Sequence, residues 1–160
     1  MSARPDLRAI ASWAFYDFAN TIFSMNVISL YFALWVIVDH GGQDILYSGA
    51  LSISMIAVAV SAPIFGVISD QTGRRRLPLA FLTIISVFAT VFIGQTNQLW
   101  VGILLFIIAN YCYQSALIFY NGMLPNVARR SSVGIVSGYG VSLGYLGSIV
   151  GLLIVEPFVT

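Results

Sequence analysis

The sequence predicts an all-α integral membrane protein with five transmembrane helices. Of its 160 residues, 59% are hydrophobic and 8% are charged, whereas soluble domains have roughly 45–50% apolar and about 25% charged residues. The charged residues are clustered, and four stretches contain none of them: 18–38, 45–69, 77–128 and 131–155. A helix needs about 20 mostly apolar residues to cross the hydrocarbon core of a bilayer. The third stretch is long enough for two helices, and the polar segment 95–98 divides it.

The five helices are expected at about 10–38, 45–68, 77–95, 99–124 and 134–156. The first apolar run is far longer than that of a signal peptide, so we interpret it as a retained helix. Pro78 opens the third helix, Pro125 closes the fourth and Pro157 closes the fifth, because a missing N–H group costs least at helix ends. Pro63 lies inside the second helix, where we expect it to kink the backbone.

All the basic residues lie in segments that these helices place on one side of the membrane. They are Arg4, Arg8, the three arginines at 74–76, Arg129 and Arg130. By the positive-inside rule that side is cytoplasmic, so the amino terminus is cytoplasmic and Thr160 lies on the opposite side. The short amino terminus carries no targeting peptide, which favours a bacterial plasma (inner) membrane over an organelle membrane.

Composition and residue types exclude several other functions. The net charge of +1 leaves no basic face that could neutralise a nucleic-acid backbone, so we expect no nucleic-acid partner. The single cysteine, Cys112, lacks a partner for a disulfide or a thiolate metal site. The single histidine, His40, is expected to be solvated in an outer loop without a second metal ligand. With no catalytic or phosphate-binding motif either, we expect no metal, no cofactor and no enzymatic activity.

Polar side chains inside the apolar spans are candidates for a solute pathway, since they are costly in hydrocarbon unless they face protein or water. At helical spacing, one stripe on the first helix contains Trp13, Asp17, Asn20, Thr21 and Ser24. A second stripe on the fourth helix contains Asn110, Tyr113, Gln114 and Asn121. Asp17 is the one acidic residue well inside a span. It is either part of a substrate or proton pathway or a structural carboxylate paired with nearby loop arginines.

The fifth helix is rich in glycine, with three pairs at four-residue spacing: Gly134, Gly138, Gly140, Gly144, Gly147 and Gly151. A lipid-facing surface needs no glycine, whereas glycine lets two helix backbones approach closely. The second helix offers a matching face of small residues: Ser54, Ala57, Ala59, Ser61, Ala62 and Gly66. We therefore expect these two helices to pack together, either as a static contact or as faces that slide during a functional cycle.

The connection between the second and third helices contains the most specific local motif. Residues 66–76 read GVISDQTGRRR, and this segment resembles the signature loop of the major facilitator superfamily, G-x-x-x-D-x-x-G-[RK]-[RK]. The resemblance implies a gating loop formed by Gly66, Asp70, Gly73, Arg74, Arg75 and Arg76. Gly73 permits a tight turn with a positive φ, and the arginines can anchor the loop to anionic lipid. The alternative is an ordinary positively charged hairpin loop.

Three further segments resemble one branch of that superfamily, the vacuolar amino-acid effluxers, whose founding members are autophagy-related fungal proteins. Residues 13–23 resemble the motif W-x-x-Y-D-x-A-N-x-x-F, residues 120–125 resemble Y-N-x-x-L-P, and residues 137–147 resemble S-G-x-G-x-x-x-G-Y-x-G. The resemblance implies a secondary active transporter that moves a small solute, with amino acids as one candidate, by alternating access. In that fold the first and fourth helices line a central cavity, so both polar stripes would face a common pathway.

Transporters of this family usually have about twelve helices in two six-helix halves. We therefore expect residues 1–160 to form a partial amino-terminal transmembrane bundle, which is most of one half. The expected partners are the missing second half, the lipid bilayer, a small-molecule substrate and, through Asp17, protons. The alternative from another class is a small non-transporting membrane scaffold or assembly subunit that binds partners through its glycine-rich helices.

Reporter fusions test the predicted topology. A tag that is active only in the periplasm should work after Asp39, after Gln98 and at the carboxyl terminus, because the arginine clusters keep the opposite loops in the cytoplasm. The same tag should be inactive after Arg75 or Arg130. The reverse pattern of activity would contradict the orientation and the placement of every motif.

Overall fold

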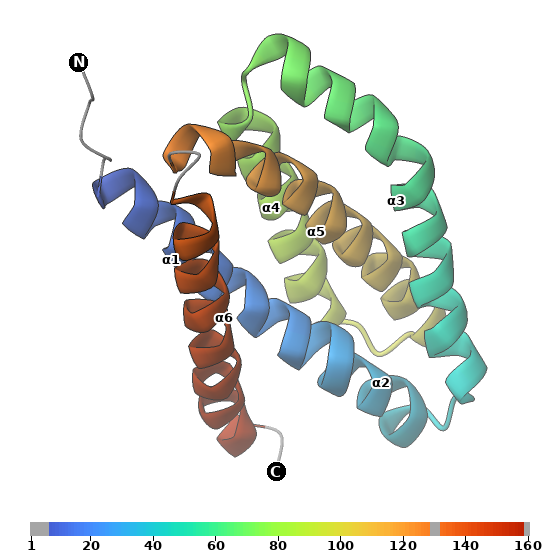
Figure 1. The fold of residues 1–160 in the computed structure, drawn as a ribbon. Helices are drawn as coiled ribbons and strands as arrows, with labels where there is room; N and C mark the ends of the chain where they lie inside the picture. Colours follow the sequence, from blue (N-terminus) through green and yellow to red (C-terminus); the bar gives the residue numbers. More distant parts are fainter. Residues whose placement is uncertain (1–6, 129–131, 159–160) are drawn as a thin grey trace, which may run out of the picture. The chain divides into compact units, whose positions relative to one another are not determined.

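The computed structural model describes residues 7–128 and 132–158, and every regular element within these residues is a helix. Five helical segments are long and apolar enough to cross a membrane: Leu7–Asp39, Asp44–Thr72, Arg76–Ile93, Leu99–Val127 and Val133–Val155. The predicted all-α class with five spanning helices is thus confirmed for this part of the chain (Figure 1). Arg4, Arg129 and Arg130, on which the predicted orientation partly depends, lie outside the described residues.

The first span changes its winding along its length. It consists of α1 (Leu7–Phe23), a π-helix (Ser24–Tyr31), the short α2 (Phe32–Leu34) and a second π-helix (Trp35–Asp39). In the first π-helix the hydroxyl group of Ser29 donates a hydrogen bond to the carbonyl oxygen of Ser24, five residues earlier, at 3.0 Å. Winding of this kind is rare and is frequently found at functional sites. The hydropathy pattern gave no sign of it.

The remaining spans are α3 (Asp44–Thr72), α4 (Arg76–Ile93), α5 (Leu99–Val127) and α6 (Val133–Val155), followed by a 3₁₀ turn (Glu156–Phe158). Helix α3 continues through Pro63. Helix α5 continues through Pro125 to Val127, although the sequence suggested that Pro125 would close it. A proline removes one N–H donor, and a helix can continue for a last turn beyond that loss.

Several hydroxyl side chains within the spans bond to carbonyl oxygens of their own helices. Thr21 donates to the carbonyl oxygen of Asp17 at 2.8 Å, and Thr90 donates to that of Ser86 at 2.8 Å. A hydroxyl group that bonds within its own helix needs no other partner, so it is tolerated in hydrocarbon. Polarity alone therefore does not place a serine or threonine on a solute pathway.

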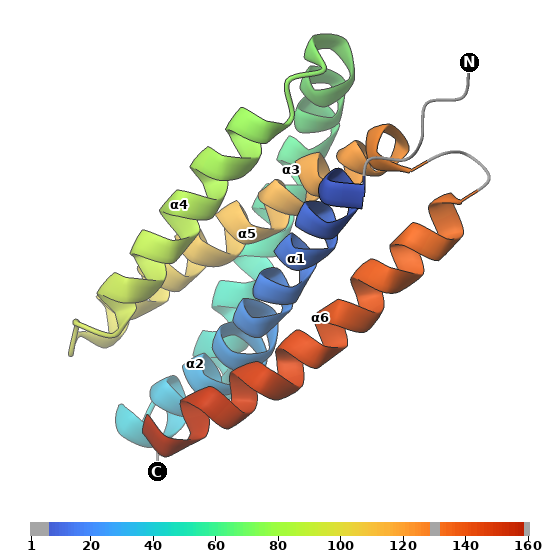
Figure 2. The ribbon, with the colours of Figure 1, turned by 90° about the vertical axis from the view of Figure 1, so that its left-hand side faces the viewer.

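The chain is organised as two compact units. The first unit runs from the amino terminus to Tyr31 and from Met123 to the carboxyl end, and the second unit is Phe32–Gly122. In the first unit α1 and α6 lie side by side (Figure 1, Figure 2). This pair contains the acidic residue of the first polar stripe and the glycines of the fifth span.

Four glycines of α6 leave no room for a Cβ atom beside α1: Gly140, Gly144, Gly147 and Gly151. At Gly147 the obstructing atoms belong to the backbone carbonyl group of Phe18, which cannot move without separating the two helices. Small residues allow this close approach, as expected for helices that associate in a membrane. The sequence pointed to the second span as the partner of these glycines, and the structure assigns that role to α1.

Gly134 and Gly138 differ from the other glycines of α6. No atom lies within 4 Å of the position that a Cβ atom would take at either residue, and both are exposed. A packing role for Gly138 stays a prediction, whereas the four glycines that contact α1 form one continuous stripe.

The second unit has an aromatic core that joins three helices. The rings of Phe32 and Phe106 stack face to face with their centroids 4.0 Å apart, and the ring of Tyr47 lies beside both. The hydroxyl group of Ser86 on α4 donates a buried hydrogen bond to the carbonyl oxygen of Ala109 on α5 at 3.0 Å. These contacts hold α2, α3, α4 and α5 together as one bundle.

Replacing Gly147 with alanine should lower the stability of the protein, because the new methyl group would overlap the backbone of α1 at Phe18. Overpacking of this kind costs about 1–3 kcal/mol. The matched change Gly138→Ala should leave stability unchanged or raise it slightly, since its surroundings are open and alanine favours helices. Thermal unfolding of the purified variants in detergent measures both effects. Equal unfolding midpoints for the two variants would contradict the assigned interface.

Candidate functional site

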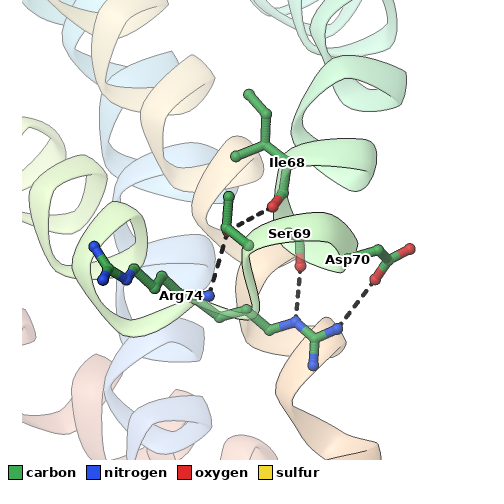
Figure 3. A network of polar contacts seen from close by, with 6 residues as sticks. Ile68, Ser69, Asp70 and Arg74 are labelled. Atoms are coloured by element: carbon green, nitrogen blue, oxygen red, sulfur yellow. Dashed lines mark hydrogen bonds and ion pairs between the residues drawn. The ribbon is translucent and has the colours of Figure 1, made fainter.

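One glycine makes the turn between α3 and α4. Gly73 follows the last residue of α3 with φ 62° and ψ −3°, a left-handed conformation that other residues rarely adopt. The hydroxyl group of Thr72 donates to the carbonyl oxygen of Ile68 at 2.6 Å and accepts the backbone N–H of Arg74 at 3.3 Å (Figure 3). The positive φ predicted at Gly73 is confirmed.

Arg75 fastens this turn to the last part of α3. Its Nε donates to Ser69 Oγ at 2.8 Å, and a terminal guanidinium nitrogen donates to Asp70 Oδ1 at 3.0 Å (Figure 3). The side chain of Arg75 is 14% exposed, whereas that of Asp70 is 80% exposed. An ion pair to so exposed a carboxylate contributes little by itself. The more buried bond to Ser69 is therefore what holds the guanidinium group in place.

Gly122 of α5 provides the surface on which Arg75 rests. A Cβ atom at Gly122 would lie 3.1 Å from Ser69 Oγ and 3.2 Å from Arg75 Nε, so a larger residue would press on both side chains. Ser69 and Gly122 belong to this loop site, although the sequence motif did not predict them. A glycine near the end of a helix of large residues was the only available signal, and nothing in the sequence paired it with Arg75.

The other residues of the loop motif have different surroundings. Gly66 is half-buried in α3, and no atom lies within 4 Å of where its Cβ atom would be. Arg74 and Arg76 are exposed, and the side chain of Arg74 points away from Asp70 (Figure 3). Of the three arginines, one holds the turn and two can meet solvent or lipid headgroups. A gating role for the loop stays a prediction.

Two residues of the first polar stripe lie where α1 contacts α6. A Cβ atom at Gly144 would lie 3.0 Å from Asp17 Oδ2 and 2.8 Å from Thr21 Oγ1. In the part of the chain that the structure describes, the Asp17 carboxylate has no hydrogen bond or ion pair. Asn20 and Ser24 are half-buried, as is Asp17. The carboxylate is thus placed at a helix contact without a partner that neutralises it.

The second stripe includes one fully buried amide. Asn110 on α5 donates through Nδ2 to Ser54 Oγ on α3 at 2.6 Å, and its Oδ1 has no partner among the described residues. Ser115 on the same helix is also fully buried with an unpaired hydroxyl group within that set. The remaining residues differ in exposure: Tyr113 and Gln114 are half-buried and Asn121 is exposed. That the two stripes share one pathway stays a prediction.

The chemistry available at these positions is hydrogen bonding and the binding of one proton. Within residues 7–128 and 132–158, no three histidine, cysteine, aspartate or glutamate side chains are grouped to hold a metal ion. Both stripes consist of uncharged side chains apart from Asp17. Such a set can bind a polar solute through hydrogen bonds, and Asp17 can accept or release a proton.

Comparison with known families agrees with the loop motif and the five apolar helices. The profile of the Major Facilitator Superfamily matches residues 1–152 of the chain. The chain therefore belongs to this family of membrane transporters and is an integral multi-pass membrane protein. The match is to the superfamily as a whole, so the narrower resemblance to the vacuolar amino-acid effluxers stays a prediction.

Curated relatives include two bacterial proteins and one plant protein. An uncharacterized protein of Aquifex aeolicus (strain VF5) is 31% identical over 154 residues, which cover 94% of this chain and 38% of that protein. The uncharacterized MFS-type transporter YxiO of Bacillus subtilis (strain 168) is 29% identical over 152 residues, which cover 89% of this chain and 36% of that protein. The high affinity nitrate transporter 2.7 of Arabidopsis thaliana is 31% identical over 142 residues, which cover 84% of this chain and 28% of that protein. The chain thus spans less than half the length of each. No solved structure matches it.

Replacing Arg75 with glutamine in the full-length protein should reduce transport several-fold, because the bonds from its guanidinium group to Ser69 and Asp70 are lost. The matched change Arg74→Gln removes the same charge from an exposed position and should have little effect. Gly73→Val should act like Arg75→Gln, since a β-branched residue at this positive φ stores about 1–3 kcal/mol of strain.

Uptake into vesicles, divided by the amount of protein in the membrane, measures this effect. The amount itself should stay near the wild-type level, because the hydrophobic helices drive insertion. Loss of protein in proportion to the loss of transport would mark the loop as a folding element only.

Proposed function

We propose that residues 1–160 are the amino-terminal part of a secondary active transporter that moves a small solute by alternating access. The observation that carries the proposal is the superfamily match over residues 1–152. This match favours a transporter over a non-transporting membrane scaffold. Alternating access needs two helical bundles that rock around a site between them. Since the chain covers 38%, 36% and 28% of its relatives, the remaining length is proposed to supply the second bundle.

The transporter is proposed to lie in a bacterial plasma (inner) membrane with its amino terminus in the cytoplasm. The arginines at 74–76 and the absence of arginine from the segments 39–44 and 94–98 support this orientation. In this arrangement the α3–α4 turn faces the cytoplasm, where Arg74 and Arg76 meet anionic lipid headgroups. The turn, held by Arg75 and Gly122, then serves as a gating loop at the cytoplasmic end of the second unit.

Two solute classes are the first to test. The resemblance of residues 13–23, 120–125 and 137–147 to the vacuolar effluxers favours amino acids, and one relative is a high affinity nitrate transporter. The full-length protein, reconstituted into vesicles, should exchange a labelled solute across the membrane when the same solute is loaded inside. A panel of the twenty amino acids and nitrate distinguishes the classes. If no small polar solute were exchanged, the transporter proposal would be contradicted.

Asp17 is proposed to couple transport to protons or to orient a hydrogen bond near Asn20. Its carboxylate is half-buried within the first span and lies against Gly144 of α6 without a described partner. A carboxylate in this position can bind and release a proton when its surroundings change. Movement of α6 along α1 would change those surroundings, which supports the coupling role.

Replacing Asp17 with asparagine should abolish accumulation driven by a proton gradient while leaving solute exchange largely intact. Asparagine keeps the size of the side chain and one acceptor oxygen but cannot bind a proton. Asp17→Glu keeps the carboxylate and should restore part of the accumulation. Both assays are run on the same vesicles with equal amounts of protein. Wild-type accumulation by Asp17→Asn would remove this residue from the coupling mechanism.

A further inference from the structure

His40 joins the end of the first span to the loop between α4 and α5. Its Nδ1 lies 3.1 Å from the carbonyl oxygen of Trp35, and its Nε2 lies 3.2 Å from the carbonyl oxygen of Asn97. All three residues belong to the second unit. The side chain is half-buried, which differs from the solvated histidine expected from the sequence.

Both partners of the His40 ring are carbonyl oxygens, and a carbonyl oxygen can only accept a hydrogen bond. Neutral imidazole carries one N–H group, so its second nitrogen would direct a lone pair at the other oxygen. Imidazolium carries two N–H groups and satisfies both oxygens. Only the protonated ring can therefore donate to both oxygens at once.

The indole ring of Trp35 is a second, independent attraction for positive charge. The ring centroids of Trp35 and His40 are 4.0 Å apart, within the range at which a cation is attracted to an aromatic ring. Trp35 is itself held in place, because it stacks on Phe32 with centroids 5.5 Å apart. It also occupies the space that a Cβ atom would take at Gly102 of α5.

Few other titratable groups surround His40. Asp39 precedes it and Asp44 begins α3; both are exposed, and neither forms an ion pair with it among the described residues. Tyr47, further along α3, packs into the aromatic core of the unit. The loop 94–98 and the first turn of α5 contain no titratable side chain. The protonation of His40 itself therefore decides whether both contacts form.

We propose that His40 is a pH-operated latch, which holds the end of the first span against the α4–α5 loop. The latch is closed when the imidazole is protonated, because both carbonyl oxygens then receive a donor. It opens as pH rises and the proton is lost, since one hydrogen bond and the attraction to Trp35 disappear. Imidazole groups generally change charge between about pH 5 and 8, so this is the range over which the latch is tested.

In the proposed transporter this latch lies on the side opposite the cytoplasm and responds to the pH of the outer compartment. That consequence rests on the proposed function and orientation. The latch itself rests only on contacts within the second unit. An acidic exterior would hold the outer end of this unit together, and a neutral or alkaline exterior would release it.

Two measurements on the purified full-length protein, prepared without a polyhistidine tag, test the latch. NMR of ¹⁵N-labelled histidine reports the protonation of the ring, and the signal missing from His40→Phe identifies His40. Hydrogen exchange, corrected for the intrinsic effect of pH, reports opening of the α4–α5 loop. The reporting amides are those of Gln95 and Thr96, which donate to carbonyl oxygens of α4 at 3.2 and 3.3 Å.

We expect the protection of these amides against exchange to fall about tenfold over the pH range in which NMR shows that His40 loses its proton. A tenfold change is the size expected for the loss of one charge-assisted hydrogen bond. His40→Phe keeps a flat ring beside Trp35 but cannot donate, so the loop should exchange rapidly at every pH. Asn97→Ala is the matched control, because only the backbone carbonyl group of Asn97 is used. It should keep the pH response.

Three results would overturn the latch: a neutral imidazole while the loop is protected, protection that does not change with pH, or a wild-type response in His40→Phe. If His40→Phe does not fold, His40→Gln serves to assign the NMR signal of His40. The pH dependence of protonation and of loop protection in the wild-type protein then decides between the latch and its absence. Vesicle transport is measured separately. A titrating latch in a protein without transport would contradict the proposed function and leave the latch standing.

Discussion

Backbone polar groups have no water to bond with inside hydrocarbon, and this constraint shapes every span of the protein. Each span is helical, including the parts of the first span that wind as a π-helix. Two hydroxyl groups are satisfied in the same way, since Thr21 and Thr90 bond to carbonyl oxygens of their own helices. Because lipid is as apolar as the helices, their association then depends on close packing and on hydrogen bonds between them.

The contact between α1 and α6 links this packing to the proposed chemistry. Gly147 lets α6 approach the backbone of α1 at Phe18, and Gly144 brings α6 against the carboxylate of Asp17. Larger residues at these two glycines would hold the helices apart. The stripe that stabilises the first unit therefore also sets the surroundings of Asp17. A movement of one helix along the other would alter the environment of this carboxylate.

Two polar contacts hold the ends of α4 in the second unit. At its beginning Arg75 bonds back to Ser69 and Asp70 of α3. At its end the loop that follows α4 is held to His40 through the carbonyl oxygen of Asn97. A guanidinium group stays charged at all physiological pH values, whereas an imidazole does not. The charge of Arg75 at the beginning of α4 thus does not change with physiological pH, whereas the proposed latch makes the contact at the other end depend on pH.

Hydropathy, motif spacing and residue type, read from the sequence by itself, determined the five spans, the left-handed turn at Gly73 and the superfamily. These features depend on residues close together in the chain. Helical periodicity also shows which residues share a face, but it does not show which other helix meets that face. Only the tertiary structure decided that the glycines of α6 contact α1, that Arg75 rests on Gly122, and that His40 bonds to Asn97. Each of these contacts joins residues far apart in the sequence, and folding alone brings such atoms within bonding distance.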